Sequence, residues 1–139
     1  MKKAIVIVLC LILGGALIVC AAVGFGSNVR NAEVYDVPSE LYTKDDIDSA
    51  IEQIKSEFAL GWRGCELLEI YYAGDDVSAE YQDWAERYNA DEVIVLLSSF
   101  ETDSPAGNSG LNSDFTYKNW NWILVRTSGG NWKHVDHGY

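Results

Sequence analysis

Residues 117–139, YKNWNWILVRTSGGNWKHVDHGY, decide the fold. Two segments rich in Trp, Tyr, Ile, Leu and Val flank residues 128–131 (SGGN), and residues of these types favour β-strands. The Gly-Gly pair supplies the positive φ that a two-residue primed turn requires. The pattern therefore predicts a β-hairpin in which residues 117–127 pair with residues 132–138.

A two-residue turn also sets the register of this hairpin, because it pairs Ser128 with Asn131. Side chains alternate along a strand, so His134 and Asp136 are expected on one face and His137 on the other. The first face is expected to carry Ile123, Val125, Trp132, His134 and Asp136. The second face is expected to carry Trp120, Trp122, Leu124, Val135, His137 and Tyr139.

The length and charge of the chain limit the classes of function. A chain of 139 residues that is 48% hydrophobic suits one domain with a proper core. Its net charge of −11 repels phosphate backbones, so no nucleic-acid partner is expected.

The amino terminus has the pattern of an export signal. Lys2 and Lys3 precede an uncharged apolar run over residues 4–26. Three fates remain open: an uncleaved anchor, a lipoprotein cut before Cys20 and lipidated there, or a cleaved signal peptide. The anchor ranks first, because a helix of this length spans a bilayer core of about 30 Å. Each fate places the domain on the extracytoplasmic side of the cell membrane.

A linker and then a long helix are expected after this run. Residues 27–40 are interpreted as the linker, and residues 41–139 as the domain. Thr43 and Asp46 resemble a capping box, which predicts a helix over residues 43–60. Apolar residues at helical spacing form the stripe that is expected to pack on a sheet: Ile47, Ala50, Ile51, Ile54 and Phe58.

The remaining elements complete an α+β fold. A strand is expected over residues 65–73, beginning with Cys65 as a small buried hydrophobe. Ser78 is expected to cap a short helix that carries Trp84 and ends at Asn89. Residues 92–100 (EVIVLLSSF) lack alternation, which is typical of a strand buried on both faces. Together with the hairpin, this predicts a long helix on a mainly antiparallel four-stranded sheet.

The polar loop over residues 102–114 contains oxygen ligands, but their spacing does not match an EF-hand. The residues concerned are Asp103, Asn108, Asn112 and Asp114. We expect no metal site and no cofactor.

His134 and Asp136 are the catalytic candidates. An imidazole beside a carboxylate suits a general base. The pair could also begin a metal site, but a closed site needs further ligands. The alternative is a partly buried histidine whose hydrogen bonds are local.

Trp120, Trp122 and Trp132 are the ligand-binding candidates. Trp120 and Trp122 share a face and could form an aromatic floor for a ligand or a patch for a protein partner. Equally, they could be core residues beneath the helix that carries Trp84.

With WNWILVRTSGGNWKHVDHGY (residues 120–139) and DEVIVLLSSF (residues 91–100) in view, the chain resembles the nuclear transport factor-like superfamily, which includes cystatin-like relatives. The resemblance covers residues 41–139. It implies a curved sheet wrapped around helices to form a cone, which is often dimeric and sometimes holds a ligand. A homodimer is therefore possible, and no catalytic residue is transferred from the family.

Two functions follow as hypotheses. The first is a membrane-tethered, extracytoplasmic, non-enzymatic domain that binds a small ligand or a protein partner. The alternative is a small-pocket enzyme that uses His134 and Asp136 in general acid–base chemistry.

Overall fold

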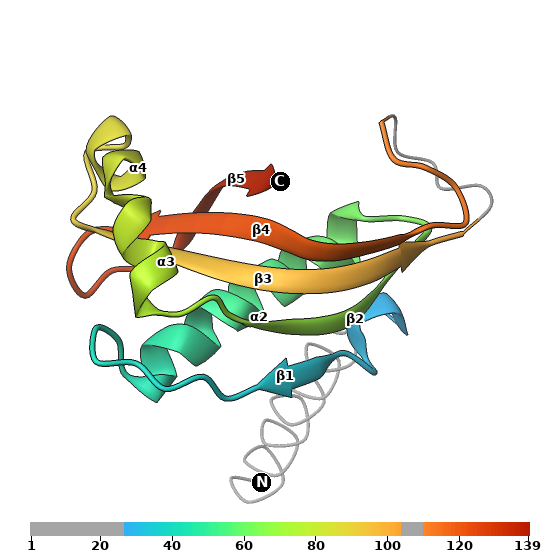
Figure 1. The fold of residues 1–139 in the computed structure, drawn as a ribbon, viewed down its shortest axis with the longest axis horizontal. Helices are drawn as coiled ribbons and strands as arrows, with labels where there is room; N and C mark the ends of the chain where they lie inside the picture. The colour runs from blue at the N-terminus through green and yellow to red at the C-terminus, as the bar shows by residue number, and fades with distance from the viewer. Residues whose placement is uncertain (1–26, 104–109) are drawn as a thin grey trace, which may run out of the picture.

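The computed structural model describes residues 27–103 and 110–139 (Figure 1). It has an α+β fold in which one long helix, α2 (Lys44–Gly61), packs on a five-stranded sheet. The strands are β1 (Glu33–Tyr35), β2 (Cys65–Tyr72), β3 (Glu92–Thr102), β4 (Thr116–Arg126) and β5 (Lys133–Gly138). A short 3-10 helix, η1 (Ser27–Val29), precedes β1.

The sheet has the order β1-β2-β3-β4-β5. β1 runs parallel to β2 because α2 makes the crossover between them, and every other neighbouring pair is antiparallel. The predicted count of four strands was wrong, because part of the expected linker forms β1. In the same segment Val29 is buried in the main core.

α2 confirms the predicted helix and its apolar stripe. Thr43 caps the helix and forms the expected capping box with Asp46. The buried residues of α2 are Ile47, Ala50, Ile51, Ile54 and Phe58, the five predicted ones. They pack on the sheet with Trp122, Leu124 and Trp132.

Two short helices, α3 (Asp75–Glu80) and α4 (Gln82–Arg87), cover one end of the opposite face (Figure 1). A second, smaller core there includes Ala85. Ser78 does not cap a helix, as the sequence predicted, since α3 already begins at Asp75. The buried Ser78 hydroxyl instead accepts a hydrogen bond from the backbone N–H of Val95.

β3 is the central strand and confirms the prediction of burial on both faces. Its residues from Val93 to Leu96 are fully buried. Both neighbours of β3 contain a bulge near the same position: Leu68 is the extra residue in β2, and β4 places Lys118 and Asn119 opposite Ser99. Asn119 has a φ of 55°, as a bulge residue often does. Bulges bend strands, so both neighbours of β3 turn at this level.

The predicted hairpin is confirmed, but its register is wrong near the turn. The last pair is Val125 with Lys133, so the loop is longer than two residues. Only Gly129 in this loop has a positive φ, of 74°, and the Ser128 N–H donates to Asp91 rather than pairing with Asn131.

A bulge in β5 then restores the predicted register farther along. Leu124 pairs with His134, whereas Ile123 pairs with Asp136, so Val135 is the extra residue. This bulge places His134 and His137 on the α2 face, opposite Leu124 and Trp122, respectively. The predicted shared face for His134 and Asp136 was therefore wrong.

Within residues 27–103 and 110–139, no helix has the length and apolarity that crossing a membrane requires. The apolar run over residues 4–26, with the lipidation candidate Cys20, lies outside the described residues.

Candidate functional site

His134 and a glutamate of α2 form the centre of the site. Nδ1 of His134 lies 2.6 Å from Oε2 of Glu57. The carboxylate accepts the Nδ1–H, and its other oxygen accepts a hydrogen bond from the Gln53 amide at 2.9 Å. The His134 side chain is only 14% exposed, so the imidazole is held between α2 and β5 in a fixed orientation.

His137 extends this arrangement toward solvent. Its Nδ1 lies 3.2 Å from Nε2 of His134, and the same Nε2 lies 3.1 Å from the carbonyl oxygen of Asp136. Glu57, His134 and His137 thus form a continuous chain of polar contacts that begins on α2 and ends at the exposed edge strand.

Desolvation lowers the pKa of His137, and the neighbouring His134 lowers it further. Asp136 and Glu57 act in the opposite direction without reversing the shift. This shift favours the neutral form of His137, and a neutral imidazole can accept a hydrogen bond or bind a cation.

Asp136 occupies a different position from the one expected of it. It pairs with Ile123, whose side chain belongs to the core under α3 and α4, so its carboxylate points away from the His134 ring. Its backbone carbonyl, not its side chain, contacts His134. The carboxylate that orients the imidazole is that of Glu57.

Trp122 and Trp132 are core residues. They are 0% and 5% exposed, and their indole N–H groups donate to Ser98 Oγ and the Asp46 carbonyl, respectively. Trp122 packs on Phe58 of α2 and not beneath the helix that carries Trp84, as the core interpretation had placed it.

Trp120 is different, because it is only partly buried and stacks on His137 at 5.9 Å between ring centroids. Its indole N–H is buried without a hydrogen-bond partner in the described part of the chain. Trp62 and Tyr139 contact the same ring edge-on. We call His137, Trp120, Trp62 and Tyr139 the His137 surface.

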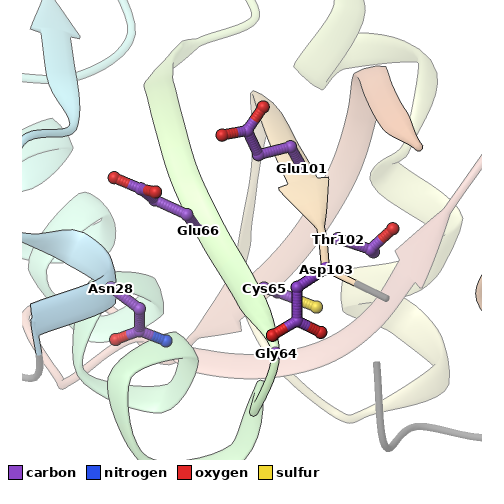
Figure 2. Close-up of a pocket in the computed structure, with 7 residues that line it drawn as sticks. All are labelled: Asn28, Gly64, Cys65, Glu66, Glu101, Thr102 and Asp103. Carbon is purple, nitrogen blue, oxygen red and sulfur yellow. The ribbon is translucent and has the colours of Figure 1, made fainter. Parts of the chain in front are cut away.

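A separate, acidic cavity lies elsewhere on the sheet. It has a volume of about 520 Å³ and opens where β2 begins and β3 ends (Figure 2). Its lining residues are Asn28, Gly64, Cys65, Glu66, Glu101, Thr102 and Asp103. Burial, aided by Asp103, raises the pKa of the Cys65 thiol, so this cysteine is the inert buried residue that the sequence predicted.

A second cavity, of about 390 Å³, lies between the β1–α2 connection and the start of α2. Tyr42 and Ile47 line it together with Lys44, whose ammonium is paired with Asp36 and Asp48. Lys44 is the only cationic side chain among the described residues that line this cavity, and Asp36 and Asp48 already neutralise its charge.

Among residues 27–103 and 110–139, no three His, Cys, Asp or Glu side chains are grouped to hold a metal ion.

The sequence analysis did not identify Glu57 as a site residue, because Glu57 lies 77 residues from His134 in the chain. One feature of the sequence did indicate its position. Glu57 directly precedes Phe58 of the buried stripe, so its side chain is expected at the border of the helix–sheet interface.

Comparisons with protein-family models, with curated proteins and with solved structures find no match.

Proposed function

We propose that this chain is a membrane-tethered, extracytoplasmic domain that binds a small ligand on the His137 surface. The observation that carries the proposal is the position of the His137 ring, which is both held in place and exposed. The ring is held by Trp120 and by His134, yet it remains exposed at the sheet edge. Its Nε2 makes no hydrogen bond within the described residues, so it is available to a ligand.

The surroundings of His137 define the chemistry of the ligand. Trp120, Trp62 and the 79% exposed Tyr139 present aromatic rings, which suit an apolar or aromatic ring of a ligand. The imidazole supplies one directed polar contact. Aromatic rings together with few polar groups are typical of small-molecule sites. The acidic cavity lacks aromatic walls and is a weaker candidate.

The tether and the shape of the sheet belong to the same proposal. The lysines and the apolar run over residues 4–26 support attachment to the membrane, with the domain outside the cytoplasm. The bulges beside β3 support a curved, cone-like sheet around α2. A protein partner or a second copy of the chain remains the alternative occupant of the surface.

A ligand screen by NMR tests the proposal on the full-length protein in detergent micelles. Ring-containing metabolites are added singly, and the ring signals of His137 and Tyr139 are followed. We expect the tightest ligands to shift these signals and to bind at least about tenfold more weakly to Trp120→Leu, since one buried aromatic contact contributes about 1.4 kcal/mol or more.

Glu101→Gln is the matched control, because it alters the acidic cavity and leaves the His137 surface intact. Ligands whose affinity falls in the Glu101→Gln variant and is unchanged in the Trp120→Leu variant would contradict the proposal.

The enzyme alternative is favoured by one observation, the chain of contacts from Glu57 through His134 to His137. Such a chain orients an imidazole for proton transfer. Glu57 then takes the role that the sequence assigned to Asp136. Hydrolysis of chromogenic esters by the wild-type protein, abolished by Glu57→Gln and retained in Asp136→Asn, would establish this alternative; equal loss in both variants would refute it.

A further inference from the structure

Three potential metal ligands lie together at the bulge of β5. Nε2 of His134 is 3.2 Å from Nδ1 of His137 and 3.1 Å from the Asp136 carbonyl oxygen. Two ring nitrogens and a carbonyl oxygen are the kinds of atom that bind divalent transition metals. They come together because the extra residue, Val135, brings both histidines to the same face.

The spacing of the nitrogens suits one shared ion. Zinc binds imidazole nitrogen at about 2.0–2.1 Å, so two nitrogens on a tetrahedral zinc stand roughly 3.3 Å apart. The separation in the structure is 3.2 Å. A small rotation of the exposed His137 ring directs its Nδ1 lone pair onto the same point as that of His134.

The opposite side of the His134 ring is already arranged as metal sites require. Metal-binding histidines usually donate their second N–H to a carboxylate, which fixes the tautomer and leaves the other nitrogen free for the metal. Glu57 accepts the Nδ1–H of His134, and Gln53 in turn holds Glu57. A chain with a net charge of −11 also attracts cations to its surface.

We propose that His134 Nε2 and His137 Nδ1 bind one divalent ion of the zinc, copper or nickel class. The Asp136 carbonyl is the third ligand, and water fills the open positions. Binding requires the proton of His137 to move from Nδ1 to Nε2 by exchange with solvent, so both rings stay neutral and both facing nitrogens offer a lone pair to the metal. The proposal goes beyond the ligand-binding function, because its ligands are the two histidines and the Asp136 carbonyl, and none of the aromatic rings of Trp120, Trp62 and Tyr139 takes part.

Isothermal titration of the full-length protein with zinc, in detergent, tests the proposal. We expect one zinc per chain, with shifts in the ring signals of both histidines on an NMR spectrum. His137→Ala should weaken binding at least tenfold. Glu57→Gln keeps both ligands and should weaken it by roughly 10–100-fold, the effect of removing a partner of a metal-bound histidine.

Glu101→Gln is the matched control for Glu57→Gln, because it makes the same substitution in the acidic cavity, away from both histidines; its affinity should equal that of the wild type. Both cysteines of the apolar run remain in every variant, so zinc held by them appears in His137→Ala as unchanged binding. Such unchanged binding, or no zinc binding by the wild type, would overturn the proposal. Trp120→Leu should retain zinc, and this separates failure of the metal site from failure of the ligand site.

Discussion

Glu57 of α2 and His134 of β5 lie 77 residues apart in the chain, yet their side chains meet at 2.6 Å. This contact joins the long helix to the edge strand that completes the sheet. It also fixes the ring that positions His137. The helix that builds the core therefore also supplies the polar group that organises the site.

The first prediction is that Glu57 and His134 are energetically coupled. A hydrogen bond to a charged group contributes about 1.5–3 kcal/mol when buried, and partial exposure of Glu57 reduces this to about 1 kcal/mol. A double-mutant cycle of Glu57→Gln and His134→Gln, followed by chemical denaturation, measures the coupling. Additive effects of the two substitutions would show that the contact does not stabilise the fold.

The second prediction concerns the stripe of α2. Ile54 is fully buried, so Ile54→Ala should lower the free energy of unfolding by about 2–5 kcal/mol. Leu60→Ala on the same helix is the control, because Leu60 is 80% exposed and its truncation should change stability by less than about 0.5 kcal/mol. Equal losses in the two variants would contradict the packing of α2.

The third prediction is a dependence of stability on pH that originates at Asp46. The hydrogen bond from Arg126, and next the Thr43 backbone N–H, hold the pKa of Asp46 below its usual value. Because the folded-state pKa is lower than the unfolded one of about 3.9, the contribution of Asp46 is complete above that pH and is lost as the pH falls through the folded-state pKa.

Asp46→Asn should therefore destabilise the protein by about 1 kcal/mol at neutral pH, and this difference should shrink below about pH 4. Asp45→Asn, at the neighbouring exposed position, is the control. A difference between wild type and Asp46→Asn that stays constant down to about pH 2 would contradict the assignment.

The sequence predicted the elements whose patterns are local. The capping box of Thr43 and the stripe around Ile54 lie within one helix, and the apolar run of β3 lies within one strand. β1 was missed because it has three residues, all exposed, and forms only by pairing with β2. A strand of this kind leaves no periodic pattern to detect.

The candidate site was predicted only in part, for a related reason. His134 was found as a candidate, but its partner was not, since the contact with Glu57 depends on how α2 crosses the sheet. The bulge at Val135 changes which side chains share a face, and one shifted residue reverses them all. The hairpin loop also makes a contact distant in sequence, from the Ser128 N–H to Asp91, which no local pattern specifies.

The fourth prediction concerns the amino terminus. The apolar run is long and its cleavage sites are poor, so the chain should stay attached to the membrane. Mass spectrometry of the native protein should find either the intact amino terminus or a diacylated Cys20. A soluble product beginning near residues 22–25 would contradict this expectation.

The most direct test of the site is the hydrogen bond of His134, measured by NMR of the imidazole nitrogens at neutral pH. The structure predicts a proton on Nδ1 that is shifted downfield and protected from exchange, since Glu57 accepts it at 2.6 Å. That signal should be lost in Glu57→Gln and unchanged in Asp136→Asn. Loss of the signal in Asp136→Asn with retention in Glu57→Gln would contradict the site described here.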